Sequence, residues 1–154
     1  MDDIDRVLIE ALRRDGRASW AELGRLVGLS GPSVTDRVSR LEASGVITGY
    51  HAAVDPVALG RSVAALVGVY LSDTSDQDAV TSALQRLDEV EDCWFVAGDE
   101  SFLIKVRVPD VAGLERTLSR LRRIRGVART RTTVVLSTKW EGRAAPADAV
   151  GVRI

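Results

Sequence analysis

Hydrophobic positions in the first 43 residues recur every three or four residues, in three separate runs. Each run places its apolar side chains on one side of a helix, a spacing that predicts three amphipathic helices. The first is expected over residues 2–14, the second between Ser19 and Gly28, and the third between Ser30 and Gly45. The inward positions are Ile4, Val7, Leu8, Ala11 and Leu12 in the first helix, Ala21, Leu23, Leu26 and Val27 in the second, and Val34, Val38 and Leu41 in the third. These three faces predict one small shared core.

The residues that flank the second and third helices predict a tight turn between them. Ser19 and Glu22 have the spacing of a capping box, in which each side chain accepts from the other residue's backbone amide. Gly28 suits a helix end, and Ser30 suits the start of the next helix. A turn of this length between two short helices is typical of a helix-turn-helix motif. An extended segment is expected to follow over residues 46–54.

The third helix carries polar side chains on its outward face. Ser33, Asp36, Arg37 and Arg40 lie there, with Ser30 at the helix start. A polar, arginine-bearing helix after a tight turn has the geometry that enters a DNA major groove. The two arginines suit phosphates or base edges. Asp36 suits a cytosine contact or a brace for a neighbouring arginine. The alternative for all of these polar residues is an ordinary solvated helix face.

The hydrophobic period changes after residue 62. Apolar, β-branched runs predict strands over residues 63–71, 90–97, 102–108 and 127–138, and helical spacing predicts helices over 75–87 and 110–125. Ser75 and Asp78 are spaced as a capping box. The order βαββαβ is that of the ferredoxin-like fold, an antiparallel sheet with both helices on one face. The other face is expected to be apolar and to pair sheet to sheet in a dimer.

The predicted fold class is therefore α+β, with an N-terminal three-helix helix-turn-helix (winged-helix-like) domain and a C-terminal ferredoxin-like domain. The expected domains are residues 1–52, a hinge over 53–61, residues 62–140, and a loose tail over 141–154. Four arginines lie near the end of the last predicted helix, where cations suit the negative end of the helix dipole: Arg120, Arg122, Arg123 and Arg125. Guidance of DNA around an oligomer is the alternative for that run.

Composition narrows the class of protein. The chain has 154 residues, of which 45% are hydrophobic and 28% charged, which excludes a disordered chain. No apolar run reaches the roughly 20 residues that span a bilayer, and no signal-peptide pattern is present, so a cytoplasmic protein without membrane contact is expected. One cysteine and one histidine exclude an internal disulfide and a Cys/His metal cluster. We expect no metal and no cofactor, and we expect Cys93 to be a buried apolar residue.

Net charge gives little support for nucleic-acid binding by itself. The chain carries 21 basic and 22 acidic residues, a formal net charge of −1. The expected electrostatic footprint is therefore a local basic patch, doubled by dimerisation, rather than a basic domain.

Several motifs resemble the Lrp/AsnC family of transcriptional regulators, also called feast/famine regulators. The matching stretches are Asp3-Ile4-Asp5, Asp15-Gly16-Arg17-Ala18-Ser19, Val27-Gly28-Leu29-Ser30, the run from Arg37 to Ile47, Asp55-Pro56 with Leu59-Gly60, and Val96-Ala97-Gly98-Asp99 followed by Leu103-Ile104-Lys105-Val106. The resemblance covers about residues 1–140. It implies a regulator that binds double-stranded DNA as a homodimer, with two recognition helices in successive major grooves. It also implies assembly of dimers, commonly into octamers, and a small effector, usually an amino acid.

The resemblance places the effector near the turn between the middle strands, Gly98 to Ser101, with help from the last strand. Gly98 lets a ligand approach the backbone closely. Asp99 or Glu100 suits an α-ammonium group, and backbone amides suit a carboxylate. Thr130 and Thr132 share one face of the last strand and offer hydroxyls. The alternative to effector binding is that these residues form an ordinary hairpin turn.

The chain departs from the family at this turn. Family members usually carry a tyrosine–aspartate pair after the glycine–aspartate, where this chain has Glu100 and Ser101. Either Asp99 or Glu100 takes over the role of the missing aspartate, or the ligand preference differs, or the site is idle.

Two other functions fit the same resemblance. An effector-independent DNA-packaging or assembly protein shares the fold and the DNA-binding helix. Some proteins that look like this family are enzymes that decarboxylate a tetrapyrrole, siroheme, and such chemistry favours histidines and cationic groups around a pocket. With His51 as its single histidine, the chain is expected not to be an enzyme.

Overall fold

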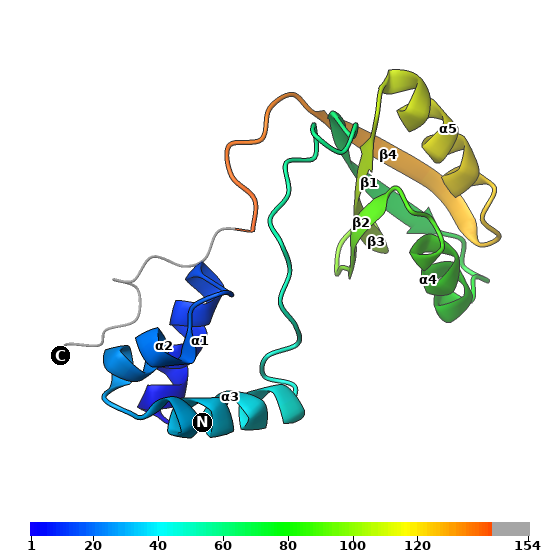
Figure 1. The fold of residues 1–154 in the computed structure, drawn as a ribbon. Helices are drawn as coiled ribbons and strands as arrows, with labels where there is room; N and C mark the ends of the chain where they lie inside the picture. The colour runs from blue at the N-terminus through cyan, green and yellow to red at the C-terminus, as the bar shows by residue number, and fades with distance from the viewer. Residues whose placement is uncertain (143–154) are drawn as a thin grey trace. The chain divides into compact units, whose positions relative to one another are not determined.

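The computed structural model describes residues 1–142, which divide between two compact units (Figure 1). Residues 1–53 belong to the first unit and residues 54–139 to the second. The tail expected from residue 141 lies outside the described residues from residue 143 onward.

The first unit consists of three helices, α1 (Asp3–Arg14), α2 (Trp20–Val27) and α3 (Gly31–Ala43). Capping residues set each start, because their side chains accept from backbone amides that a helix leaves unpaired. Ser19 and Glu22 form the predicted capping box, and Ser30 caps α3. A second capping box, between Asp2 and Asp5, begins α1. The core consists of Leu8, Leu12, Leu23, Val34 and Val38.

The turn between α2 and α3 depends on a close backbone approach at Gly24. The amide of Leu29 donates to the Gly24 carbonyl at 2.9 Å, which folds the chain back onto α2. A Cβ at residue 24 would lie 2.5 Å from the Leu29 carbonyl oxygen, closer than a real Cβ contact. Gly28, with a φ of +70°, ends α2 in the left-handed conformation that glycine favours. The absence of a side chain at Gly24 is therefore a condition for the helix-turn-helix angle.

Residues 46–54, expected to be extended, form no strand within the described chain. Strand assignment needs a paired neighbour, and this segment has none in residues 1–142. Tyr50 instead folds back onto the helices: its hydroxyl donates to Oε1 of Glu42 at 2.9 Å. The helix-turn-helix part of the prediction thus forms without a paired wing.

The second unit is a four-stranded sheet with the strand order β2-β3-β1-β4. The strands are β1 (Val63–Leu71), β2 (Val90–Phe95), β3 (Phe102–Val108) and β4 (Val127–Val135), and the helices are α4 (Gln77–Gln85) and α5 (Val111–Arg122). All neighbouring strands are antiparallel. This order confirms the ferredoxin-like arrangement, with β1 and β3 central and both helices on one face (Figure 1).

Two local expectations in this unit are wrong. Asp76, rather than Ser75, caps α4, accepting from the amides of Asp78 and Ala79. Ser75 donates its hydroxyl to the Gly126 carbonyl at 2.7 Å, a contact with a residue far away in the sequence. Cys93 is exposed because it lies on β2, an edge strand.

The two faces of the sheet differ in chemistry. The helix-covered face holds the buried core, including Val67, Val69 and Ile104. The register places Leu66, Leu103 and Trp94 on the other face, together with a charged group of Lys105, Glu91 and Arg107. Burial raises the pKa of Glu91, but the hydrogen bonds from Lys105 and Arg107 outweigh it, so this pKa lies below its ordinary value. The helix-free face is therefore an apolar strip beside ion pairs, less uniformly apolar than expected.

We expect Gly24→Ala to destabilise the helix-turn-helix unit, because the added methyl group meets the Leu29 carbonyl. The loss should be roughly 1–3 kcal/mol, the range for overpacking a core, measured by urea unfolding. Gly31→Ala is the matched control, since the nearest atom to its new Cβ lies 4.0 Å away. Equal stability of the two variants would contradict the close approach as the constraint.

Candidate DNA interface and effector turn

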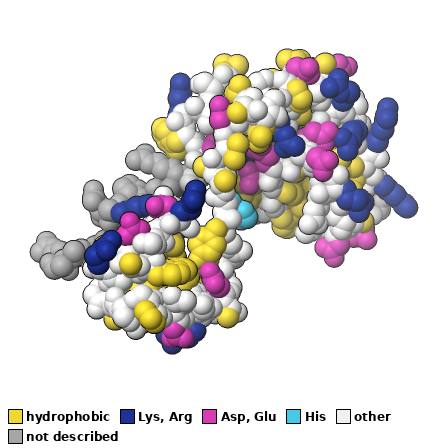
Figure 2. All heavy atoms as spheres, viewed as in Figure 1, with side chains coloured by type: hydrophobic (Ala, Val, Ile, Leu, Met, Phe, Trp, Pro, Cys, Tyr) yellow, Lys and Arg dark blue, Asp and Glu magenta, His cyan; other side chains and the backbone are white. Residues whose placement is uncertain are grey.

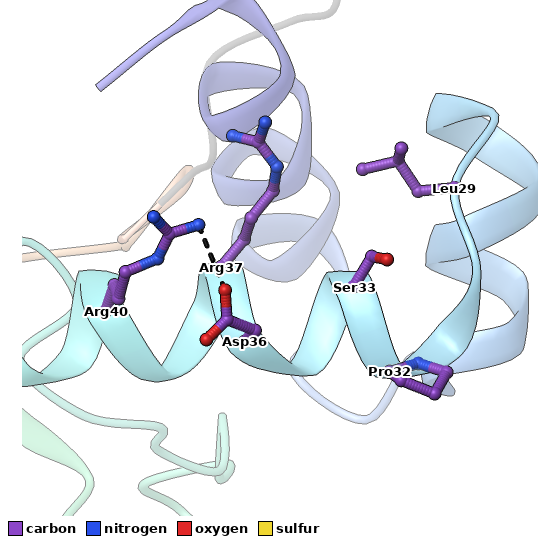
Figure 3. Close-up of a pocket in the computed structure, with 6 residues that line it drawn as sticks. All are labelled: Leu29, Pro32, Ser33, Asp36, Arg37 and Arg40. Atoms are coloured by element: carbon purple, nitrogen blue, oxygen red, sulfur yellow. Dashed lines mark ion pairs between the residues drawn. The ribbon is translucent and has the colours of Figure 1, made fainter.

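The outward side of α3 borders an open groove of about 480 Å³. Its lining residues are Leu29, Pro32, Ser33, Asp36, Arg37 and Arg40, all shown in Figure 3. Four of the five residues predicted to contact DNA therefore line one groove, and Ser30, the fifth, begins the same helix. Leu29 and Pro32 were not predicted as lining residues, because an apolar side chain and a helix-start proline carry no signal for DNA contact.

Asp36 and Arg40 form an exposed ion pair on this face. Their atoms Oδ2 and Nη2 are 3.2 Å apart, and the two side chains are 73% and 67% exposed. Asp36 therefore braces a neighbouring arginine, one of the two roles expected for it. Ser33 is also exposed, and its hydroxyl lies 2.9 Å from that of Ser30.

Arg37 differs from the other groove residues, since its side chain turns toward α1 (Figure 3). Its Nη1 donates to Asp2 at 2.7 Å and to Asp5 at 2.8 Å, and 23% of the side chain is exposed. Sequence reasoning missed this pairing because the partners lie more than 30 residues away. Arg37 thus ties α3 to the capping box of α1.

The two carboxylates and the guanidinium at this contact stabilise one another's charged forms. The pKa of Asp2 lies below its ordinary value because the Asp5 amide and then Arg37 hydrogen-bond to its carboxylate. The pKa of Asp5 is lowered by the Asp2 amide and by Arg37, against partial burial. The pKa of Arg37 is raised by Asp2 and Asp5 in turn. The contact is therefore a charged link between α1 and α3.

The turn over residues 98–101 connects β2 to β3, and its last two residues bind to β1. The amide of Ser101 donates to the Val69 carbonyl at 2.9 Å, and its hydroxyl accepts from the Leu71 amide at 3.4 Å. Glu100 lies against Gly68, where a Cβ would be 2.6 Å from Cγ of Glu100. Gly68 thus leaves the space that the glutamate side chain occupies.

Glu100 is held by polar groups on β1 and β4. Tyr70 donates its hydroxyl to Oε1 at 3.0 Å, and Nη1 of Arg131 lies 3.7 Å from the same oxygen. The Arg129 guanidinium lies over the Tyr70 ring, 3.8 Å from its centroid. The pKa of Glu100 is lowered by its own backbone amide, then by Tyr70, and further by the nearby arginine charges.

The remaining predicted effector residues fall into two groups. Gly98 and Asp99 are exposed, and Asp99 makes no hydrogen bond or ion pair within residues 1–142. Thr130 and Thr132 pair with Val69 and Val67, so they lie on the helix-covered face of the sheet. Glu100 lies on the opposite face, beside Gly68. The structure therefore does not bring these threonines to the turn; the neighbouring Arg129 and Arg131 lie on the face of Glu100 instead.

Two further features of the described residues bear on the site. No helix among them is long and apolar enough to cross a membrane. No cluster of three histidine, cysteine, aspartate or glutamate side chains among them has the arrangement of a metal site.

Comparison with known proteins assigns both units. Residues 1–42 match the model of the AsnC-type helix-turn-helix domain, and residues 64–145 match that of the Lrp/AsnC ligand-binding domain. The chain belongs to the Lrp/AsnC family. As an Lrp/AsnC protein, it is a DNA-binding transcriptional regulator with a ligand-binding domain.

Several Lrp/AsnC relatives match over nearly the whole chain. The transcriptional regulator LrpA of Mycobacterium tuberculosis is 43% identical over 143 residues, covering 93% of this chain and 95% of the relative. The leucine-responsive regulatory protein of Escherichia coli is 39% identical over 139 residues, covering 88% and 85%. A solved feast or famine regulatory protein from M. tuberculosis, complexed with L-methionine, is 43% identical with a TM-score of 0.87, covering 92% and 96%. Both curated relatives are named as regulators.

We expect Arg37→Ala to lower the unfolding midpoint of the helix-turn-helix unit at neutral pH, because it removes the link to Asp2 and Asp5. Both carboxyl groups have folded-state pKa values below the ordinary 3.8, so the link is complete above that value and is lost as the pH falls through the lowered values. The gap between wild type and variant should therefore close in acid, as measured by circular dichroism.

The control for this comparison is Arg40→Ala, which removes an exposed ion pair. Exposed pairs contribute about 0–1 kcal/mol, so this variant should stay close to wild type in stability. A destabilisation by Arg37→Ala that persists unchanged at acid pH would contradict the charged link.

Proposed function

We propose that this regulator recognises a DNA sequence with the outward face of α3 and adjusts its assembly or DNA affinity when an amino acid binds at residues 98–101. The observation that carries the proposal is the polar groove on α3, where Ser33, Asp36 and Arg40 are exposed while the valines and Leu41 are buried. A recognition helix needs this division between a buried side and a free polar side.

Within this proposal, Arg40 is the principal base or phosphate contact. Asp36 holds its guanidinium at 3.2 Å and restricts its directions. Ser30 and Ser33, at the positively polarised start of α3, are suited to a phosphate oxygen. Arg37 contributes positioning rather than contact, since its Nη1 already binds Asp2 and Asp5.

We propose that the regulator acts as a homodimer formed through the helix-free face of the sheet, and that dimers can assemble further into octamers. The apolar strip of Leu66, Leu103 and Trp94 supports this surface, because Leu66 is 36% and Trp94 47% exposed in the single chain. A dimer would present two copies of α3, as two successive major grooves about 34 Å apart require.

For the effector, the free carboxylate of Asp99 is the proposed partner of the α-ammonium group, and the turn amides bind the α-carboxylate. Glu100 is less available, because Tyr70 and Arg131 already hold its carboxylate. The complex of a 43% identical relative with L-methionine supports an amino acid as the ligand class. The chain lacks the family's tyrosine–aspartate pair at this turn. These contacts favour Asp99 as the residue that takes over the role of the missing aspartate.

A regulator without an effector is the second candidate function. It is favoured by the two residues at the family's tyrosine–aspartate positions, since Glu100 binds Tyr70 and Ser101 binds backbone of β1. Calorimetric titration with all twenty amino acids separates the candidates, because heat from none of them would favour a DNA-packaging or assembly role.

Sequence-specific recognition is tested by a gel shift on the DNA upstream of the chain's own gene, against a scrambled duplex of equal composition. Non-specific affinity falls steeply with salt, whereas base contacts persist. Equal affinity for both duplexes at elevated salt would contradict recognition by α3.

We expect Arg40→Ala to weaken binding to the upstream DNA roughly 5- to 150-fold, which corresponds to about 1–3 kcal/mol for an arginine–base contact, with assembly unchanged by light scattering. Arg13→Ala, which removes a similar arginine–carboxylate pair on α1, is the matched control. Loss of assembly in Arg40→Ala would show that this side chain serves packing.

We expect Asp99→Asn to weaken binding of the responding amino acid by about tenfold or more, as a lost charge-assisted hydrogen bond of about 1.5–3 kcal/mol requires. Asp88→Asn is the control, since Asp88 is also exposed but precedes β2 rather than following it. DNA binding without effector should be preserved in both variants. An unchanged calorimetric titration for Asp99→Asn would exclude this carboxylate from the site.

A further inference from the structure

Helix α5 carries a stripe of arginines on the side opposite its buried residues. Arg116, Arg120 and Arg123 are spaced at i, i+4 and i+7, so they share one face. Leu114, Thr117 and Leu121 face the sheet core. Figure 2 shows basic side chains over α5 and its end, a segment that contains arginines and no lysine. We call Arg116, Arg120 and Arg123 the α5 arginine face; Arg122 and Arg125 follow at the end of the helix, outside this face.

The charge of this face is largely uncompensated. Arg120 pairs with Glu89 at 2.6 Å, but no carboxylate within residues 1–142 forms an ion pair with Arg116 or Arg123, or with Arg122 and Arg125 nearby. Residues 110–126, which comprise α5 and its two ends, contain five arginines and two carboxylates, a net charge of +3. Of the two acidic residues of this segment, Asp110 caps α5 by accepting from the Gly113 amide, and Glu115 is exposed.

Helix stability does not account for the pattern. The helix dipole favours cations only in the last turn, which covers Arg120, Arg122 and Arg123 but not Arg116 in the middle of α5. Like charges at i and i+4, as for Arg116 and Arg120, destabilise a helix by about 0.2–0.5 kcal/mol. Helix stability therefore does not explain Arg116, and its position beside Arg120 points to an external anion.

We propose that the α5 arginine face binds the phosphate backbone of DNA, as a second contact surface outside the sequence recognised by α3. Guanidinium groups bind phosphate oxygens bidentately, and a row of them suits a polyanion better than a single small ligand. DNA is already the partner of this regulator, so the duplex flanking a recognised site is present whenever the protein is bound. The acidic surface of a second copy is the competing occupant, and the test below separates it from DNA.

This inference rests on DNA binding by the helix-turn-helix unit, but not on any particular operator or effector. It predicts a contribution that is independent of sequence and sensitive to salt, because each neutralised phosphate adds about 0.9 to the slope of log affinity against log salt. The contribution should be the same on the upstream DNA and on its scrambled counterpart.

The test compares the full-length protein with the double variant Arg116→Ala/Arg123→Ala. Both are titrated against the upstream duplex and the scrambled duplex, each about 60 base pairs long, between about 50 and 200 mM salt. The expected result is a salt slope smaller by about 1.8 on both duplexes and an affinity roughly tenfold weaker at the lowest salt, for two lost phosphate contacts. Arg40→Ala should instead reduce the preference for the upstream duplex.

The matched control is Arg116→Lys/Arg123→Lys, which keeps both charges and should retain most of the salt slope. Thermal unfolding checks folding: the alanine variant should be as stable as wild type, since it relieves like-charge repulsion in α5. An unchanged slope in the folded alanine variant would overturn the proposal. A change in assembly by light scattering with an unchanged slope would also overturn it, and would assign the face to a second copy of the chain.

Discussion

The contact between the backbones of Gly24 and Leu29 is the constraint on which the DNA-binding unit depends. Their approach folds the chain tightly enough after α2 for Val34 and Val38 of α3 to reach the core around Leu8 and Leu23. Once those valines are buried, helical geometry leaves Ser33, Asp36 and Arg40 on the outside. One missing side chain in α2 therefore determines which side of α3 faces solvent, and recognition follows from packing.

Much of the fold was predictable because its signals are local. Caps and apolar periodicity mark the starts of α2 and α3, and β-branched runs mark the strands, including the exact bounds of β3. The failures involve partners distant in sequence: Ser75 binds Gly126 instead of capping α4, and residues 46–54 have no strand to pair with. An edge position, which depends on strand order, similarly exposes Cys93.

In the candidate site, too, local features were predictable and contacts between distant residues were not. Periodicity identified the outward face of α3, but it treated Arg37 and Arg40 alike, because nothing local distinguishes an arginine that binds α1 from one braced by Asp36. In the effector turn, the sequence indicated Thr130 and Thr132 as a pair on one strand face. The register with β1, which no local pattern specifies, places them on the side covered by the helices.

The position of Glu100 over Gly68 has a mechanical consequence. A residue of a connecting turn occupies a recess in the central strand at Gly68, and Ser101 is hydrogen-bonded to the same strand just beyond that recess, at Val69 and Leu71. The turn is therefore anchored to β1 and is not a free loop at the edge of the sheet. Any molecule that displaces Glu100 must shift β1 or break the hydrogen bond between its carboxylate and Tyr70. Binding at this turn is therefore mechanically coupled to β1, a central strand of the sheet.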